Sequence, residues 1–505
     1  MFFRIRSSLI ARWQSLFGRE RLGRQASLVV IGDLISFASS LVSSMVLARI
    51  ISVTSMGTYR QVLYLGPLVA VLIEFGLSST VYRFWNLYEG DKRKRYAKLL
   101  ILLTVSVGSI GSIILAALSE PLSVAYENPA LRNSLLVTCA FPLATIPLGV
   151  LRPVLLSRGY SLRATLLETT FSVISFASMV LPLMAGYALT EALFIWTVFS
   201  LLRLIALPII LGKYLKGPGS WLDREILAEL WSYLWPIQLG RIPAYLASYL
   251  DKIVASLYLT PQNFAAYSLG AREIPFVNMI GPSVAGVLIP HMVQDAQADN
   301  IDRICQRWRS CAEKTALLTY LIASFCVWHA VPIMQFLFSS VYIESSVPFR
   351  AFAAITFVRV IEYGSLAKAF GWSGTIMRSA LISAVVLAIA MLVLTWQLGV
   401  LGLALSFLVS TVASSWYYLI VYARRLKRRV SSFFPIVRLC FIFMVSGAST
   451  IIASTLMASF VKIEPAMGFV RVGLSLLYLF MGAGFCYVAI LALFALMRRR
   501  FVSAK

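Results

Sequence analysis

The chain has 505 residues, of which 59% are hydrophobic and only 13% are charged. This composition excludes an ordinary soluble domain, in which about a quarter of the residues carry a charge. The formal net charge of +24 would suggest a nucleic-acid partner in a soluble protein. Here, however, Lys and Arg gather in alternate gaps between apolar stretches, which is the positive-inside pattern of a polytopic membrane protein. We therefore expect no nucleic-acid partner.

Apolar stretches of helix length fill the chain. A helix needs ~20 apolar residues to cross about 30 Å of hydrocarbon, so the sequence predicts an all-α integral membrane protein with about fourteen transmembrane helices and no separate soluble domain. The first seven are expected near residues 26–50, 59–82, 99–118, 134–156, 164–185, 191–212 and 232–258. The others are expected near 264–290, 315–338, 348–370, 379–397, 400–423, 438–460 and 470–497.

The basic residues distinguish the two sides of the predicted bundle. On the side that holds both termini, they gather before the first span, near residues 83–95, after residue 423 and at the C-terminal end. On the other side, the connections between the predicted spans contain only two basic residues, Arg132 and Lys462. Because short cytoplasmic loops carry the excess of Lys and Arg, we expect both termini to be cytoplasmic.

Four polar segments flank or separate the spans. Residues 1–25 are basic and partly amphipathic, and they lack the cleavage pattern of a signal peptide, so we expect a cytoplasmic interfacial segment. Residues 213–231 form an amphipathic cytoplasmic linker, expected to lie on the membrane surface and to act as a hinge. Residues 424–437 are predicted to be a basic cytoplasmic loop, and residues 498–505 a cytoplasmic tail.

The cysteines point to packing rather than to a metal site or disulfides. They lie in predicted spans or on the cytoplasmic side, where thiols stay reduced. The chain has only two histidines to complete a ligand set, so we expect no metal and no cofactor. The cysteines are Cys139, Cys305, Cys311, Cys326, Cys440 and Cys486.

A weak internal repeat relates residues 46–67 to residues 254–275, at an offset of 208 residues. In both copies an apolar helix ends, a short loop follows, and a small residue precedes Tyr59 or Tyr267 near the start of the next helix. The repeat would relate helices 1 to 6 with helices 7 to 12 in the same orientation, because six is an even number.

The repeat divides the predicted bundle into two six-helix lobes. The first lobe would span residues 26–212 and the second residues 232–423. Residues 438–497 would supply two accessory helices.

Several short motifs resemble those of Wzx-type polysaccharide flippases. Leu47–Arg49, Gly57–Tyr59 and Glu74–Ser78 look like the opening of such proteins. In the second half, Tyr249–Lys252 and Ala266–Leu269 resemble an acidic-basic pair and a small-Tyr-Ser-Leu element that many of them carry in helices 7 and 8. The family belongs to the multidrug/oligosaccharidyl-lipid/polysaccharide (MOP) exporter superfamily.

This resemblance implies movement of an isoprenoid (undecaprenyl) diphosphate-linked oligosaccharide from the cytoplasmic to the outer leaflet of a bacterial inner membrane. Two lobes would alternate access around a cationic central cavity, for O-antigen, capsule or exopolysaccharide biosynthesis. The implied partners are the lipid-linked oligosaccharide, membrane lipids, a coupling ion (proton or sodium), and a polymerase and chain-length regulator of the same pathway.

Ionisable residues within spans are costly in lipid unless they face a polar cavity or a partner. Arg241, Arg272 and Arg359 lie well inside predicted helices 7, 8 and 10, and Lys368 follows toward the cytoplasm. Because an arginine fork can donate two parallel hydrogen bonds to phosphate oxygens, these four are candidates to bind the diphosphate. The alternative is interhelical bracing at helix breaks made by Pro243, Pro275 and Pro282.

Carboxylates within spans are candidates for ion coupling. Asp33, Glu74, Glu273 and Glu362 could carry a coupling proton, and Glu168 belongs to the same group, although a carboxylate near a helix end can simply be hydrated. Glu362 lies three residues after Arg359, so a local ion pair and a cavity-lining pair are both open.

A second acidic-basic pair lies on predicted helix 7. Asp251 and Lys252 are adjacent and about 100° apart around the helix, so we expect them to reach neighbouring helices or the outer interface rather than each other. Gating and anchoring are equally compatible with this position.

Other function classes remain as alternatives. A lipid II flippase or a cation-coupled multidrug antiporter of the same superfamily would share the architecture. A membrane-embedded polysaccharide polymerase fits less well, because the predicted outer gaps are too short for a catalytic loop. No P-loop pattern G-x-x-x-x-G-K-[ST] is present in the sequence, and we do not expect an enzyme.

Overall fold

The computed structural model describes residues 22–216, 220–274, 277–457 and 469–503, and every regular element in this part of the chain is helical. The predicted N-terminal interfacial segment lies almost wholly outside the described residues. The helices of the first half are α2 (Leu22–Ile50), α3 (Val53–Glu74), α4 (Leu77–Leu87), α5 (Gly90–Ala117), α6 (Ser119–Ala125), α7 (Pro129–Thr138), α8 (Phe141–Thr145), η1 (Leu148–Val150), α9 (Leu151–Ser157), α10 (Ser161–Met184), α11 (Leu189–Leu202), η2 (Arg203–Ile205), α12 (Ala206–Leu215) and α13 (Arg224–Tyr258).

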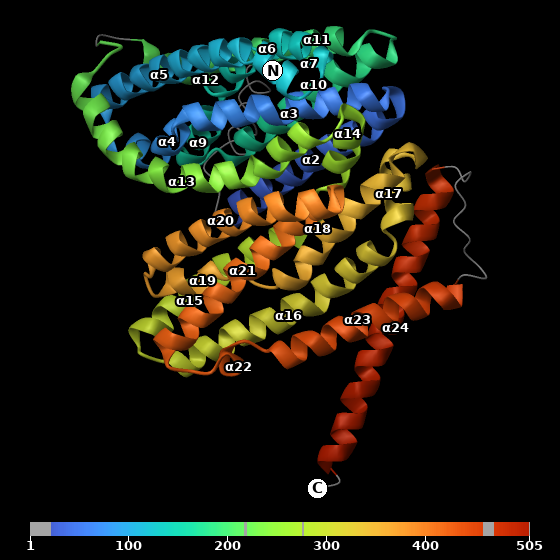
Figure 1. Cartoon of the computed structure of the whole chain (residues 1–505). Coiled ribbons are helices and arrows are strands. Elements are labelled where there is room, and N and C mark those ends of the chain that lie inside the picture. Colours follow the sequence, from blue (N-terminus) through green and yellow to red (C-terminus); the bar gives the residue numbers. More distant parts are fainter. Residues whose placement is uncertain (1–21, 217–219, 275–276, 458–468, 504–505) are drawn as a thin grey trace, which may run out of the picture. The chain divides into compact units, whose positions relative to one another are not determined.

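The second half continues in the same manner (Figure 1). Its helices are α14 (Pro261–Gly270), α15 (Val277–Gln297), α16 (Ile301–Trp328), α17 (Ala330–Phe338), η3 (Ser340–Ser345), α18 (Ser346–Val358), α19 (Gly364–Ala369), α20 (Ser373–Leu398), α21 (Val400–Leu426), α22 (Val430–Phe433), α23 (Ile436–Met457) and α24 (Phe469–Ser503).

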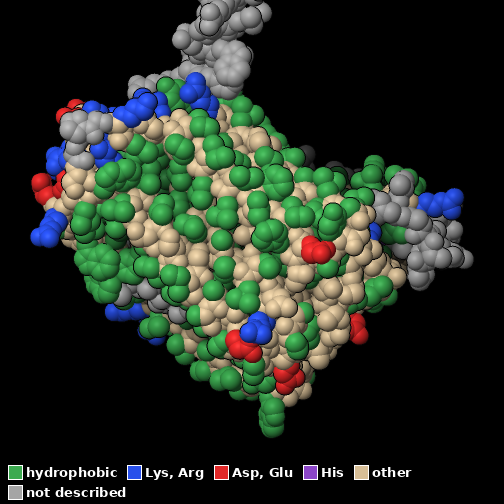
Figure 2. Space-filling view, turned by 90° about the horizontal axis from the view of Figure 1, so that it is seen from above, with side chains coloured by type: hydrophobic (Ala, Val, Ile, Leu, Met, Phe, Trp, Pro, Cys, Tyr) green, Lys and Arg blue, Asp and Glu red, His purple; other side chains and the backbone are tan. Residues whose placement is uncertain are grey.

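Twelve helical stretches among the described residues are long and apolar enough to cross a membrane, which makes the chain a multi-pass membrane protein. The all-α prediction is confirmed, but the count of fourteen spans is not: α13 and the α14–α15 pair are not among the twelve. Figure 2 shows one face that is largely covered by hydrophobic side chains, with most of its Lys and Arg side chains toward one margin. Large apolar side chains are exposed in many places, as a lipid-facing surface requires; Ile113, for example, is 69% exposed.

The chain forms two compact units. Unit 1 comprises residues 1–245 and 256–265, and unit 2 comprises residues 246–255 and 266–505. In unit 2, α20 and α21 pack side by side, and α23 and α24 pack against each other and against α16 (Figure 1). The division into lobes at 26–212 and 232–423 stays a prediction.

Two helices that the repeat makes equivalent begin at equivalent positions. Pro261, the first residue of α14, is 208 residues after Val53, the first residue of α3, and Gln262 Nε2 donates to Thr54 Oγ1 at 2.9 Å across the same sequence separation. A Cβ at Gly57 would lie 1.9 Å from the Pro261 carbonyl oxygen, so only glycine permits this approach. The equivalence ends there, because α3 continues to Glu74 whereas α14 stops at Gly270.

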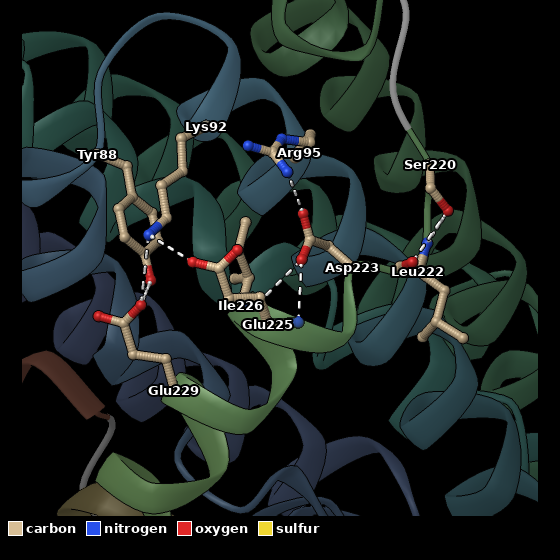
Figure 3. A network of polar contacts seen from close by, with 9 residues as sticks. All are labelled: Tyr88, Lys92, Arg95, Ser220, Leu222, Asp223, Glu225, Ile226 and Glu229. Carbon is tan, nitrogen blue, oxygen red and sulfur yellow. Dashed lines mark hydrogen bonds and ion pairs between the residues drawn. The ribbon is translucent and has the colours of Figure 1, made fainter.

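Hydrogen bonds and ion pairs connect the start of α13 to α5 and to the residues just before α5 (Figure 3). Asp223 Oδ1 accepts hydrogen bonds from the backbone N–H groups of Glu225 (3.1 Å) and Ile226 (3.2 Å), which makes Asp223 the N-cap of α13. Its other oxygen binds Arg95 Nη1 of α5 at 2.7 Å. Residues 224–231 of the predicted linker are therefore the first turns of a long helix.

Lys92 and Tyr88 extend this network. Lys92 Nζ lies 3.6 Å from carboxylate oxygens of both Glu225 and Glu229, and the Tyr88 hydroxyl donates to Glu229 Oε2 at 2.6 Å. Burial, and then the bond to the Glu229 carboxylate, raise the pKa of the Tyr88 phenol above its ordinary value, so the hydroxyl stays protonated and keeps donating.

Candidate functional site

Unit 1 contains a cluster of three charged side chains centred on Arg152. From α9, Arg152 Nη2 lies 3.0 and 3.2 Å from the two carboxylate oxygens of Asp33 in α2. Its other terminal nitrogen, Nη1, lies 3.2 Å from Glu168 Oε2 in α10. One guanidinium therefore binds two carboxylates from different helices. All three side chains are partly exposed: Arg152 at 32%, Asp33 at 41% and Glu168 at 31%.

Glu74 reaches the same region because α3 ends at a sharp break. Phe75 and Gly76 both adopt left-handed backbone conformations, with φ of 55° and 72°. Phe75 is held there by stacking against Trp231 and Trp235 of α13, with ring centroids 5.4 and 5.7 Å away. The chain then turns into α4, and Glu74 Oε1 accepts a hydrogen bond from the second residue of that helix, Ser78, at 3.2 Å.

Each unit has a cavity lined by charged side chains, of about 350 Å³ in unit 1 and about 430 Å³ in unit 2. The unit 1 cavity is lined by Glu74, Arg152 and Glu168, among others, and its neighbour Asp33 adds a further carboxylate. Three carboxylates thus face one arginine, which makes this site acidic. Such a site favours a proton or a metal cation over an anion.

In unit 2, two helix breaks bring opposite charges together. Glu273 lies between α14 and α15, and Arg359 directly follows α18 with a non-helical ψ of 50°. Arg359 Nη1 lies 2.5 Å from Glu273 Oε1, and Lys368 forms a close ion pair with Glu362. All but Lys368 line the unit 2 cavity, and Arg359 and Lys368 remain nearly half exposed, at 45% and 47%.

The structure differs from the sequence-based picture at three points. Predicted helices 8 and 10 are each interrupted, so Arg272 and Glu273 are not inside a helix. Arg359 and Glu362 do not share a helix face; of the two alternatives left open for them, the local ion pair is not found, because each binds a different partner, and both line the cavity. The helices also stay continuous at Pro243 and Pro282, so the expected breaks at those prolines are not found.

Tyrosines compensate the backbone groups that the break after α18 leaves without helical partners. The hydroxyls of Tyr320, Tyr363 and Tyr422 donate to the carbonyls of Phe357 (2.7 Å), Val358 (3.0 Å) and Tyr363 (2.6 Å). The Tyr422 oxygen also accepts from Ala367 N at 3.1 Å. Non-helical backbone within a membrane is tolerated only when its polar groups have such partners. The tyrosine hydroxyls therefore stabilise the break after α18.

Asp251 and Lys252 contact each other, contrary to expectation. Lys252 Nζ lies 3.2 and 3.3 Å from the two Asp251 oxygens, because the four-carbon lysine stem bends back across the 100° between them. The Tyr267 hydroxyl approaches Asp251 Oδ2 at 3.5 Å, and Asp251 is only 1% exposed. A gating role for the pair stays a prediction.

Of the four predicted phosphate ligands, the structure places Arg359 and Lys368 near one cavity. The side chain of Arg241 lies outside the described residues, although its backbone belongs to α13. Arg272 is half-buried and is not among the residues that line the unit 2 cavity. Arg152 was missed by the sequence reasoning, although it lies within a predicted span, 134–156, and shares the mid-span signal that singled out the other arginines.

Solved structures of MOP-superfamily proteins share this fold. The chain is similar to a lipid II flippase, MurJ, in an inward closed conformation, with a TM-score of 0.68 and 15% identity over 92% of this chain and 99% of that one. It is also similar to an inward-facing multidrug resistance MATE family transporter, with a TM-score of 0.62 and 13% identity over 78% and 94% of the two chains. A MOP superfamily transporter from Pyrococcus furiosus matches with a TM-score of 0.55 and 13% identity over 82% and 97%.

Sequence comparison gives the family. No curated protein matches the chain. The family model described as polysaccharide biosynthesis protein matches residues 22–295, which is more than half of the sequence and covers all of the charged cluster around Arg152. Together with a helical fold shared with MOP-superfamily transporters, this match shows that the chain belongs to the polysaccharide biosynthesis protein family.

Proposed function

We propose that this protein is a flippase that moves an isoprenoid diphosphate-linked oligosaccharide from the cytoplasmic to the outer leaflet of the bacterial inner membrane. The family supports a role in polysaccharide biosynthesis, and the shared fold supports transport by alternating access. The proposal includes cytoplasmic termini, as the distribution of Lys and Arg predicts.

The observation that carries the proposal is the pair of cations beside the unit 2 cavity. Arg359 lies at a helix break and pairs with Glu273, Lys368 lies in α19 and pairs with Glu362, and both cations remain nearly half exposed. A diphosphate can replace a carboxylate as the partner of an arginine or lysine, because it offers more acceptor oxygens and more negative charge. Binding would then exchange one anion for another rather than expose an unpaired cation.

The acidic cluster of unit 1 would supply ion coupling. Asp33 and Glu168 share Arg152, and Glu74 lines the same cavity. A proton or a sodium ion bound by these carboxylates would weaken their hold on Arg152, which would link ion binding to the packing of α2, α9 and α10. Downstream, a polymerase and a chain-length regulator would use the exported oligosaccharide.

The test is leaflet distribution in proteoliposomes. A lipid-linked oligosaccharide is incorporated with and without the protein, and a membrane-impermeant glycosidase reports which sugars have reached the outside. We expect protein-dependent equilibration, lost in Arg359→Ala. A matched control is Arg438→Ala, because Arg438 forms a 2.6 Å ion pair with Glu313 at comparable exposure but outside the cavity.

The same assay separates the alternatives. Movement of lipid II in place of the oligosaccharide would indicate a lipid II flippase. Uptake of an organic cation with no movement of either lipid would indicate a multidrug antiporter. Equal activity of Arg359→Ala and wild type would remove Arg359 as a substrate ligand.

A further inference from the structure

Unit 1 contains a second groove, which shares no lining residue with the charged cavity of that unit. It has a volume of about 620 Å³ and is formed by α9, α10, α12 and the residues that follow α9. Its charged lining residues are all basic: Arg158, Arg163 and Lys213. Among the lining residues that the structure describes there is no Asp or Glu. The groove is therefore suited to an anion.

The three cations lie at corresponding ends of three candidate membrane spans. Arg158 directly follows the span 129–157, Arg163 is near the start of the span 161–184, and Lys213 is near the end of the span 189–215. These ends face the predicted cytoplasmic side. The cations therefore lie at the level of the lipid headgroups of the inner leaflet.

Two tyrosines position the cations. The Tyr160 ring lies 4.9 Å from the Arg158 guanidinium carbon and 4.7 Å from that of Arg163. The Tyr214 ring lies 4.8 Å from Lys213 Nζ and 5.8 Å from the Arg158 guanidinium carbon. An aromatic face attracts a cation without cancelling its charge, so this arrangement holds three positive charges together and preserves their attraction for an anion.

The apolar wall begins one helical turn deeper. Leu155, Leu166 and Ile210 each lie three residues from one of the cations, on the side toward the middle of the span. Three residues of helix correspond to about 4.5 Å along its axis. Ile209 and Leu166 are 76% and 48% exposed, so the wall is open to the hydrocarbon.

We propose that this groove binds an anionic glycerophospholipid of the inner leaflet. The phosphate would lie among Arg158, Arg163 and Lys213, and an acyl chain would lie along Leu166, Ile209 and Ile210. Basic pockets between transmembrane helices on the cytoplasmic side are suited to such headgroups. A free phosphate would use the cations but not the apolar wall. This inference does not depend on the proposed transport function.

The test is native mass spectrometry of the purified full chain, titrated with phosphatidylglycerol or with phosphatidylcholine of the same acyl chains. The wild type is expected to prefer phosphatidylglycerol. In the variant R158Q/R163Q/K213Q, phosphatidylglycerol binding is expected to fall by about tenfold or more, because each cation near a membrane surface contributes to the attraction of anionic lipid. The matched control is R424Q/K427Q/R429Q, which removes the same charge from exposed residues of unit 2.

Further measurements make the result decisive. Monodisperse elution and an unchanged melting temperature establish that the variants fold. If the triple variant does not fold, K213Q alone is used, because Lys213 is exposed, and a smaller loss of phosphatidylglycerol binding is expected. I209Q keeps the charges and should weaken phosphatidylglycerol binding through the wall. Equal losses in the groove and control variants would overturn the proposal. So would displacement of phosphatidylglycerol by inorganic phosphate alone, or a preference for undecaprenyl phosphate over phosphatidylglycerol.

Discussion

Arg359 and Glu273 are 86 residues apart in the sequence, and their side chains meet at 2.5 Å where two broken helices of unit 2 expose them to one cavity. Each residue follows the end of a helix, α18 or α14. The contact is therefore at once an interhelical brace and a lining of the cavity, and the two roles can be separated by experiment.

A charge exchange separates bracing from substrate binding. Arg359→Glu combined with Glu273→Arg keeps an ion pair but moves the arginine to the other break. Because both side chains are partly exposed, the pair contributes only about 1 kcal/mol to stability, and the exchanged protein should recover the melting temperature that either single variant loses. Transport should stay low if the guanidinium must project from residue 359. Recovery of both properties would mean that Arg359 only braces the helices.

The cluster around Arg152 should behave as one unit. Arg152→Gln leaves Asp33 and Glu168 without their shared counter-charge, and we expect a loss of about 2 kcal/mol, between the values of exposed and buried pairs. Adding Asp33→Asn should restore part of the stability, because one carboxylate is then neutral. A double-mutant cycle on melting temperatures in detergent measures this coupling. Strictly additive effects would contradict the shared role of Arg152.

The break after α18 should depend on the Tyr422 hydroxyl. Tyr422→Phe keeps the ring but removes the group that donates to Tyr363 O and accepts from Ala367 N. Leaving two buried backbone groups unpaired should cost about 1–3 kcal/mol. Thermal unfolding measures the loss, and Tyr478→Phe is the control, because Tyr478 is 54% exposed on α24. Equal stability of the two variants would show that water satisfies the break.

Asp223 should set the stability of the start of α13. Asp223→Ala removes an N-cap and the 2.7 Å ion pair with Arg95, so we expect a loss of about 1–2 kcal/mol. Glu225→Gln is the matched control, because its side chain is 77% exposed and its only ion pair among the described residues, with Lys92, spans 3.6 Å. Hydrogen exchange over residues 224–231 should rise in Asp223→Ala and not in the control. No change in either variant would mean that packing alone holds this end.

The network around Asp223 also shows what could not be predicted from the sequence. The amphipathic character of residues 213–231 was visible in the sequence, but a linker was expected there. The cap at Asp223 decides that a helix begins at Arg224. In the same way, the mid-span charges were visible as unusual residues, but their partners were not.

The sequence by itself determined the membrane class, the all-α fold and the approximate position of most of the long helices, because hydropathy is summed over about twenty consecutive residues and is therefore a local property. It also predicted an offset of 208 residues, at which α3 and α14 begin. Only the tertiary structure decided where helices break and which charges meet. A break after Val358 needs hydroxyls from Tyr320 and Tyr422, and Arg152 pairs with an aspartate 119 residues away. Such partners are set by the packing of helices that are distant in the chain, and no local pattern encodes them.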